Sequence, residues 1–213
     1  AAPPLRVLDP ACGSGSFLLG AYQFLLDWYL NYYTQQTNPD EWLTTRHPPI
    51  YQAGVQGWKL ALAERKRILL DHVFGVDIDT QAVEVTKLSL LLRVLEGEKA
   101  LVLFHHERAL PDLAANIKCG NSLIGPDFYK GQQLAMFDEE ERFRINAFDW
   151  HAGFPDIFKD GGFDAVIGNP PYGAELHKDQ LAYLQDVFTG QSKTFDSYEL
   201  FLLRAQRLLT VNG

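Results

Sequence analysis

Four short apolar runs stand out along the chain, and helical patterns separate them. The runs are Leu5–Leu8, Val73–Val76, Asn116–Cys119 and Phe163–Ile167. Apolar runs of this length, with little alternation of apolar and polar positions, are typical of parallel strands that are covered on both faces. The pattern therefore predicts four buried parallel strands.

Between these runs, apolar residues recur every three or four positions, as in amphipathic helices. The three predicted stripes are Leu18, Ala21, Leu25, Trp28 and Tyr32; Val85, Leu88, Leu92 and Leu95; and Tyr198, Phe201, Ala205 and Leu208. Gly97 is expected to end the second helix. The third is expected to begin at Asp196, with Glu199 three residues on in a capping-box arrangement. Strands that alternate with helices predict right-handed crossovers and a doubly wound, mostly parallel α/β fold.

Two stretches, residues 31–57 and 126–162, fit this alternation poorly. We interpret both as insertions between core elements, because structureless loops of this length are uncommon inside a compact domain. The acidic run Asp138–Glu141 is expected to form a solvated face. At 213 residues the chain is long enough for one large core, but it is short for two complete domains.

The charge balance is acidic, with 19 Lys and Arg against 27 Asp and Glu, which gives a net charge of −8. This argues against broad nucleic-acid binding by this chain alone, because phosphate contacts need clustered Lys and Arg. No apolar run reaches the length of a membrane helix, so we expect a soluble protein. Cys12 and Cys119 match no zinc spacing and are expected to be free thiols, and the adjacent pair His105–His106 is not spaced for ligation. We therefore expect no metal.

Each predicted strand leads into a polar residue. Asp9, Asp77, Asn121 and Asn169 follow the four strands in order. In an open parallel sheet these positions share the carboxyl edge, where ligands bind.

The first of these turns, Asp9–Phe17, is rich in glycine. Gly13 and Gly15 let the backbone adopt positive φ and approach a ligand closely, which favours a nucleotide-like cofactor. The dinucleotide fingerprint fails, because Leu18 stands three residues after Gly15. Asp9 would repel a pyrophosphate and attract an ammonium group, so S-adenosylmethionine fits the turn better than NAD.

The second strand runs into Asp77-Ile78-Asp79. A carboxylate at the end of a strand can accept both hydrogen bonds of a ribose diol, and we assign that role to Asp77. Ile78 offers an apolar face to adenine. Asp79 is interpreted as the N-cap of the following helix.

The fourth strand leads into Asn169-Pro170-Pro171-Tyr172. Two prolines fix φ and remove two backbone donors, which leaves rigid carbonyls that only accept hydrogen bonds. The Asn169 side-chain oxygen and the Pro170 carbonyl can each take one N–H of a planar amine, and Tyr172 can stack on its ring. Two directed acceptors would stabilise positive charge that grows on the nitrogen as it attacks a sulfonium methyl group.

Taken together, Val7–Phe17 and Asn169–Tyr172 resemble the adenine-specific DNA methyltransferases of restriction–modification and phage-defence systems, above all the large type IIG enzymes. Gly75–Asp79 and Lys118–Leu123 extend the likeness over nearly the whole chain. The cofactor motif precedes the catalytic motif, which matches the gamma order of that family. The resemblance implies a Rossmann-like methyltransferase fold, S-adenosylmethionine as cofactor, and methyl transfer to N6 of a flipped adenine in DNA.

Carried over to this sequence, the resemblance implies that the methionine end of S-adenosylmethionine is lined by Asp9, Ala11, Gly13 and Gly15. Asp77 and Ile78 would hold the ribose and the adenine. Asn121 takes a position that often carries Asp and contacts the cofactor's adenine amine. The target adenine would be received by Asn169, Pro170 and Tyr172.

Residues 208–213 look like a helix end and a turn that leads into a fifth strand. We therefore expect an N-terminal catalytic portion of such an enzyme, without its target-recognition domain. The implied partners are double-stranded DNA, bound mainly through regions outside this chain, and a nuclease domain or subunit of the same system. The implied location is the cytoplasm of a prokaryote, with no membrane contact.

Three other functions stay open at this point. The same pocket chemistry suits a protein glutamine or an rRNA guanine as methyl acceptor. The fold also suits a non-catalytic specificity or scaffold subunit, and the glycine-rich turn occurs in NAD-linked oxidoreductases. Binding of S-adenosylmethionine in preference to NAD would exclude the last of these.

Overall fold

The computed structural model describes residues 4–97, 110–130, 139–173, 177–188 and 196–210. Its main sheet has the strand order β5-β4-β1-β6, and all its pairings are parallel. The strands are β1 (Val7–Asp9), β4 (Val73–Asp77), β5 (Ile117–Cys119) and β6 (Ala165–Val166). All four predicted strands are confirmed, with bounds that shift by at most two residues. His105–His106, Asp138 and residues 211–213 lie outside the described residues.

The order of the strands reverses at β1. The chain moves from β1 to β4 and on to β5, and then returns to the other side of β1 as β6. Val7 of β1 therefore pairs with Val73 on one side and with Ala165 on the other. Open α/β sheets bind ligands at the carboxyl ends of their strands, where such a reversal leaves a crevice.

Three helices pack on one face of the sheet: α1 (Ser16–Asn31), α3 (Leu62–His72) and α4 (Thr80–Leu95). The α1 helix and the turn before it approach the sheet closely at Gly75. A Cβ atom added to Gly75 would lie 2.7 Å from Leu18 Cδ1 and 3.2 Å from Cys12 Sγ. Close packing therefore requires a glycine in the middle of this strand.

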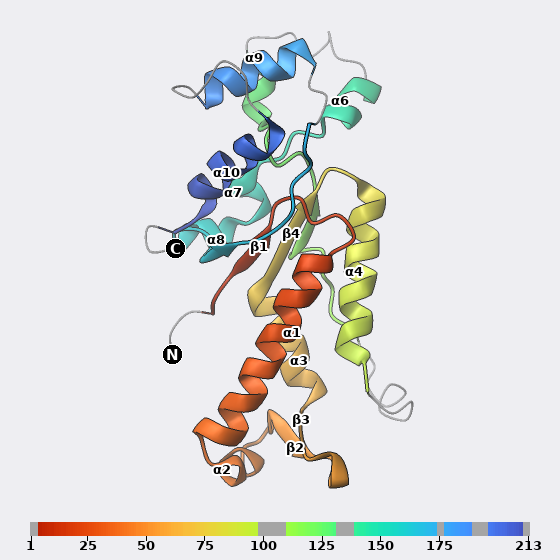
Figure 1. Ribbon diagram of the computed structural model, residues 1–213, viewed down its shortest axis with the longest axis vertical. Helices are drawn as coiled ribbons and strands as arrows, with labels where there is room; N and C mark the ends of the chain where they lie inside the picture. Colours follow the sequence, from red (N-terminus) through yellow and green to blue (C-terminus); the bar gives the residue numbers. More distant parts are fainter. Residues whose placement is uncertain (1–3, 98–109, 131–138, 174–176, 189–195, 211–213) are drawn as a thin grey trace.

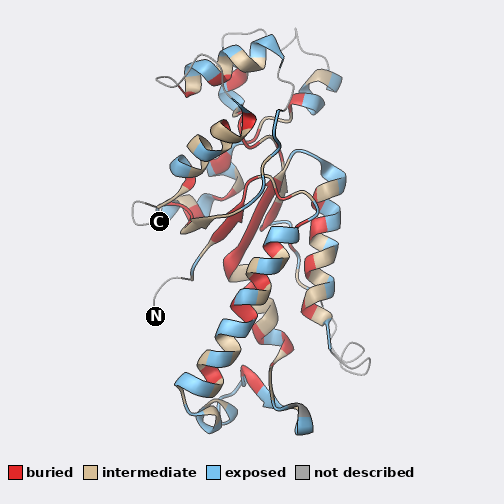
Figure 2. Cartoon of the chain, viewed as in Figure 1, coloured by how far each residue is buried: buried red, intermediate tan, exposed pale blue. Residues whose placement is uncertain are grey.

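The opposite face has its own apolar cluster, built on Leu8, Phe74 and Val76 of the strands. It is covered by the helices α7 (Trp150–Gly153), α8 (Pro155–Lys159) and α10 (Ser197–Leu208). The large residues that reach it from the stretch 126–162 are Phe148, Trp150, Phe154 and Ile157. Part of that stretch is therefore core, and the presence of a core on both faces confirms the doubly wound α/β class. Figure 2 shows the strands as the most completely buried elements.

The helix predicted around residue 90 is confirmed, but its predicted apolar stripe is wrong at three of its four positions, and only Leu95 packs against the core. Val85, Leu88 and Leu92 are 49%, 58% and 60% exposed. The buried residues of α4 are instead Val83, Thr86, Leu90 and Val94. Both sets repeat every three or four residues, and an offset of two positions turns the helix surface by about 200°. Spacing alone therefore predicts the helix and leaves its inward face undecided.

The stripe predicted for α1 is correct only in part. Leu18 and Leu25 are buried, together with Tyr22, whereas Trp28 is 46% exposed. The Trp28 ring stacks on Tyr32, at 5.6 Å between centroids, just beyond the end of the helix. The indole thus contacts neighbouring aromatic rings while nearly half of the residue stays in solvent.

The predicted helix ends are also partly confirmed. Gly97 follows α4 with φ +80°, as a helix-ending residue does. Helix α10 begins after Asp196, as predicted, but the capping box does not form. The Asp196 carboxylate accepts instead from the backbone N–H of Gly173, at 3.2 Å.

Residues 31–57 form a π-helical turn at Tyr32–Gln36, the helix α2 (Pro39–Leu43), and the strand β2 (Ile50–Gln52), which is antiparallel to β3 (Trp58–Leu60). A 3₁₀ turn, Gly54–Gln56, joins the two strands. In Figure 1 this hairpin lies at the lower end of the molecule, opposite the carboxyl ends of the main strands. It therefore takes no part in the crevice at that edge.

The carboxyl edge is overlaid by α6 (Glu139–Ile145), α9 (Lys178–Val187) and the 3₁₀ turn Pro126–Tyr129. A third apolar cluster, which includes Leu184, Phe188 and Leu200, holds this layer together. Glu139 and Glu140, from the acidic run, are exposed in the first turn of α6. No helix within the described residues is both long enough and apolar enough to cross a membrane.

The packing at Gly75 generates a prediction. Gly75→Ala is expected to lower the free energy of unfolding by about 1–3 kcal/mol, because the added methyl group must displace Leu18 or Cys12. Gly20→Ala, in the middle of α1, is the matched control. Its Cβ would meet nothing within 4 Å, and its expected effect is a gain of about 0.5–1 kcal/mol. Urea unfolding of both variants measures the difference, and equal effects would contradict the close packing.

Candidate active site

The polar residues that follow the four strands meet at one edge, as the pattern of the sequence predicts. Asp9 and Asp77 end β1 and β4, and Asn121 and Asn169 follow β5 and β6. A cavity of about 550 Å³ opens there, and its walls include Ala11, Asp77, Ile78, Asn121 and Asn169. A smaller cavity, of about 120 Å³, adjoins it and is lined by Asp9, Ala11, Gly168, Pro170 and Phe201, among others. Pro10, Ala11 and Phe201 are shared by the two cavities.

Asp9 is almost completely buried, with 1% of its surface exposed. Its Oδ1 accepts a hydrogen bond of 3.0 Å from the backbone N–H of Ala11. Burial raises the pKa of Asp9 to about 6; the Ala11 hydrogen bond lowers it, and the charge of Asp77 raises it further. No salt bridge to Asp9 is found within the described residues. Among those residues, the buried carboxylate of the site thus has no cationic partner.

The glycine-rich turn is fastened to the neighbouring elements. Gly13 and Gly15 both have positive φ, at +51° and +83°. The N–H of Gly13 donates to Asp77 Oδ2 at 2.7 Å, and the Thr86 hydroxyl donates to the Gly13 carbonyl at 2.7 Å. A Cβ on Gly15 would lie 2.9 Å from Thr86. These contacts fix the turn against β4 and α4, and neither glycine belongs to the lining of the two cavities.

Asp77 is held by two backbone donors, the N–H of Gly13 and, at 2.9 Å, the N–H of Asp79. Ile78 beside it is 48% exposed at the cavity wall. The Asp79 side chain accepts from the N–H of Gln81, at 2.8 Å, which confirms its interpretation as the N-cap of α4.

The side chain of Asn121 forms a local turn at the cavity wall. Its Oδ1 accepts from the N–H groups of Leu123, at 3.0 Å, and Ile124, at 3.3 Å. These two bonds use both lone pairs of the oxygen. The side-chain NH₂ group is therefore the part of Asn121 that remains to bind a ligand.

The Asn169–Tyr172 loop begins at a close approach between β6 and β1. Gly168 has φ +150°, and a Cβ atom on it would lie 2.5 Å from Asp9 Oδ1. Asn169 lines the larger cavity and Pro170 the smaller. Tyr172 lines neither; it is 70% exposed, and its ring lies 5.8 Å from that of Tyr198.

Several lining residues have no counterpart in the sequence motifs, namely Arg144, His177, Gln180 and Phe201. Phe201 was expected on the apolar stripe of its helix, and nothing in its spacing indicates a cavity wall. Arg144, His177 and Gln180 come from α6 and the start of α9, outside the pattern of strands followed by turns. No local signal in the sequence could have found them.

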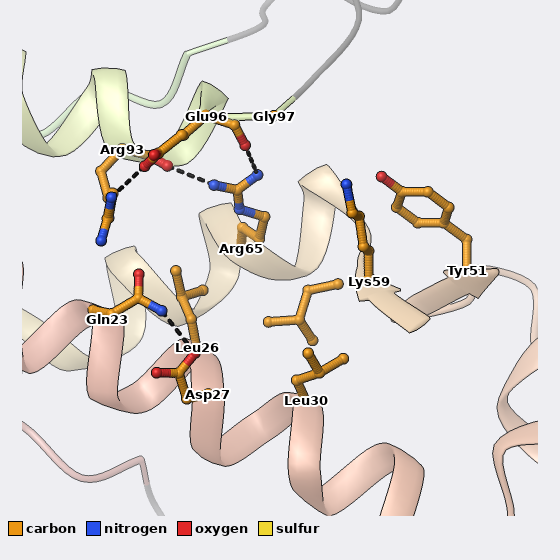
Figure 3. Close-up of a pocket in the computed structure, with 11 residues that line it drawn as sticks. Gln23, Leu26, Asp27, Leu30, Tyr51, Lys59, Arg65, Arg93, Glu96 and Gly97 are labelled. Carbon is orange, nitrogen blue, oxygen red and sulfur yellow. Dashed lines mark hydrogen bonds and ion pairs between the residues drawn. The ribbon is translucent and has the colours of Figure 1, made fainter. Parts of the chain in front are cut away.

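Another cavity, of about 360 Å³, lies near the hairpin and is drawn in Figure 3. Its polar groups bind one another: Gln23 donates to Asp27 at 2.7 Å, Arg93 pairs with Glu96, and Arg65 donates to backbone carbonyls of α4 and its C-cap. It lies away from the strand ends, so we place the candidate site at the carboxyl edge.

Comparison with known proteins gives a consistent result. A family model described as the Eco57I restriction-modification methylase matches residues 71–213. The chain is 32% identical, over 98% of its length, to the type II restriction enzyme and methyltransferase RM.Eco57I of Escherichia coli, and it covers 19% of that protein. It is 26% identical to the adenine-specific methyltransferase PglX of Streptomyces coelicolor, over 86% of this chain and 13% of that protein.

Among solved structures, a nuclease-deletion mutant of the type ISP restriction-modification enzyme LlaGI, in complex with a DNA substrate mimic, superposes with a TM-score of 0.52. The identity is 16%, over 96% of this chain and 14% of that one. At this identity the likeness supports the fold alone. The chain thus spans less than a fifth of each of these proteins.

The burial of Asp9 generates a prediction for Asp9→Asn. Because the folded-state pKa is about 6 and the ordinary value is 3.8, the folded protein holds the proton more tightly. The stability contributed by the protonated form is complete below pH 4 and is lost as the pH rises through 6. The asparagine variant should therefore be more stable than the original protein at pH 8, by about 3 kcal/mol, and the difference should disappear near pH 4.

Urea unfolding at pH 4, 6 and 8 measures this dependence. Asp186→Asn, at an exposed carboxylate, is the control and should show no comparable change between pH 4 and 8. A constant difference between the Asp9 variant and the original protein at all three pH values would contradict the titration of Asp9.

Proposed function

The chain belongs to the Eco57I restriction-modification methylase family, and from that premise we propose that it carries the site at which a methyl group passes from S-adenosylmethionine to N6 of a flipped adenine in DNA. Members of this family are methyltransferases of the restriction–modification type. The donor, the N6 atom and the everted base are the proposed refinement. The Streptomyces relative is an adenine-specific methyltransferase, which favours adenine over a glutamine amide or a guanine amine as the methyl acceptor.

One observation carries this proposal. The cavity of about 550 Å³ joins Asp77, Ile78 and Asn121, the proposed cofactor residues, to Asn169, the proposed catalytic residue. Sites for small molecules usually measure roughly 300–1,000 Å³, so this volume suits a nucleoside cofactor. A cofactor bound along β4 would thus lie in the same space as Asn169, one of the residues proposed to receive the substrate.

The residues at the strand ends fit S-adenosylmethionine. Asp9 is a buried anion that lacks a cationic partner among the described residues, and the ammonium group of the cofactor's methionine end would offset the cost of burying it. Pro10 and Ala11 line both cavities. The positive φ angles of Gly13 and Gly15 give the turn its shape. When bound, this cofactor supplies an electrophilic methyl group on a sulfonium.

In the larger cavity, Asp77 would accept the hydroxyl groups of the ribose, and Ile78 would pack against the adenine. The Asn121 oxygen already accepts two backbone hydrogen bonds. We therefore propose that its NH₂ group donates to a ring nitrogen of the cofactor adenine, rather than that its oxygen accepts from the amine.

The Asn169–Tyr172 loop would receive the target base. Asn169 and Pro170 present two acceptors to the two hydrogens of N6, which favours a pyramidal nitrogen and stabilises the positive charge that develops during attack. Tyr172 is exposed enough to turn from Tyr198 and stack on the base. Extrusion of the adenine is required, because a stacked and paired base cannot bring its amine to the cofactor.

The remaining features of the function belong to the whole protein. With a net charge of −8, this chain offers little general attraction to phosphate. We propose that double-stranded DNA is recognised largely by regions beyond this portion, in a cytoplasmic prokaryotic enzyme that acts with a nuclease domain or subunit. The stretches 31–57 and 126–162 are proposed as insertions into a single catalytic domain.

Substitution at Asn169 tests the catalytic assignment. Asn169→Ala in the full-length protein is expected to lower kcat for adenine methylation by about 10²–10³-fold, because one of two directed acceptors is lost. The dissociation constant for S-adenosylmethionine should stay within about twofold, since the side chain is proposed to contact the substrate. Transfer of tritiated methyl groups to DNA and calorimetric titration measure the two quantities. Methylation at the original rate would remove Asn169 from the mechanism.

Substitution at Asp77 should have the opposite effect. Asp77→Ala removes the acceptor proposed for the ribose, and S-adenosylmethionine binding is expected to weaken by about 10–100-fold. At saturating cofactor, kcat should recover most of its original value. Asp79→Ala, which removes only the helix cap, is the control and should leave the dissociation constant nearly unchanged. Calorimetry with S-adenosylmethionine and with NAD distinguishes this function from that of an oxidoreductase.

A further inference from the structure

The first turn of α10 contacts the Asn169–Tyr172 loop through three consecutive residues. The Asp196 carboxylate accepts from the N–H of Gly173, at 3.2 Å. The Ser197 hydroxyl donates to the Pro171 carbonyl, at 2.5 Å. The Tyr198 ring lies 5.8 Å from the ring of Tyr172, inclined at 41°. One helix turn thus touches the loop at its second proline, at its aromatic residue and at the glycine that follows.

The hydrogen bond made by Ser197 affects which proline carbonyl of the loop remains available to a substrate. Ser197 is 4% exposed, and its hydroxyl donates to the carbonyl of Pro171. Within the described part of the chain, the carbonyl of Pro170 receives no hydrogen bond. Because neither proline has an N–H, the loop has two fewer backbone donors with which to fix its own conformation. The orientation of the loop therefore depends on donors from elsewhere.

The contact made by Asp196 is separate from the formation of the helix. Asp196 holds the N-cap position of α10, yet its side chain makes no bond to the backbone of that helix. Its carboxylate instead holds the N–H of Gly173, where φ is +61°. Removal of this carboxylate should therefore affect the loop more than it affects the helix.

From these contacts we propose that Asp196, Ser197 and Tyr198 are positioning residues for methyl transfer. Ser197 engages the Pro171 carbonyl at the wall of the larger cavity in a hydrogen bond and leaves the Pro170 carbonyl, at the smaller cavity, to accept from a substrate. Asp196 anchors the far end of the loop, and Tyr198 supports the Tyr172 ring outside the cavity until a base enters. This proposal rests on the proposed function, and its test is chosen so that the two can fail separately.

The first test replaces the hydroxyl of Ser197 in the full-length protein. Ser197→Ala should lower kcat for adenine methylation by about 10–100-fold, because misplacement of a reacting group by about 1 Å costs a factor of this size. The KM for S-adenosylmethionine should stay within about twofold, since Ser197 does not line the cofactor end of the cavity. Ser197→Thr, which keeps a hydroxyl, should restore most of kcat.

The matched control is Ser89→Ala. Ser89 is also a helical serine whose hydroxyl donates to a backbone carbonyl, that of Val85, but it lies on α4 and away from the loop. This variant should keep the original kcat. If Ser197→Ala also kept it, or if it weakened cofactor binding in proportion to kcat, the positioning role would be wrong.

The second test does not depend on a buried position. Asp196→Ala should lower kcat several-fold, with little change in the midpoint of thermal unfolding, because no helix cap is lost. Asp149→Ala is its counterpart, since Asp149 does cap a helix and accepts from the N–H of Ala152 at 3.0 Å. This variant should lower the midpoint and leave kcat unchanged. If Asp196→Ala lowered the midpoint and kept kcat, while Asp149→Ala lowered kcat and kept the midpoint, the proposal would be wrong.

Failure of the proposed function has a different signature. If the unaltered protein transferred no methyl group to adenine, the function itself would be wrong. If the unaltered protein were active and the Asp196 and Ser197 variants matched it in kcat, only the positioning role would be lost.

Discussion

The structure of the site depends on the burial of one carboxylate between two parallel strands. Asp9 ends β1 with 1% of its surface exposed, and Gly168, after β6, comes so close that a Cβ would lie 2.5 Å from Asp9 Oδ1. An unpaired buried anion costs stability, which is reflected in its raised pKa of about 6. Carboxylates with a strongly raised pKa are concentrated at functional sites, and here the group stands beside the loop that carries Asn169.

Near this carboxylate, side chains of β4 and α4 hold the backbone of the first turn through short hydrogen bonds. Asp77 binds the N–H of Gly13, and Thr86 binds the carbonyl of the same residue. These bonds tie the first turn to β4 and α4, so the groups at the ends of β1 and β4 keep a fixed spacing. A site built in this way is organised before any ligand arrives, which lowers the entropic cost of binding.

The long stretch 126–162 has two structural roles. Phe148, Trp150 and Phe154 complete the core on one face of the sheet, whereas Arg144 of α6 lines the larger cavity at the carboxyl edge. This one stretch thus covers a face of the sheet and forms part of the cavity wall. This arrangement explains why the stretch lacks the regular periodicity of a single helix.

Much of this architecture could be predicted from the sequence. Short apolar runs followed by polar residues predicted four strands and a shared edge, because burial on both faces and turn chemistry are local properties. Asp9, Asp77, Asn121 and Asn169 were identified as site candidates on that basis, and the fold brings them to one edge.

Other features were decided only by the tertiary structure. The predicted stripe and the buried stripe of α4 both repeat every three or four residues. Thr86 rather than Val85 faces inward, where its hydroxyl donates to the Gly13 carbonyl. The cavity wall formed by Arg144 and Phe201 likewise has no local signal, since these residues come from helices distant in sequence. Local periodicity predicts that a helix forms, but its partners across the fold decide which of its residues reach the site.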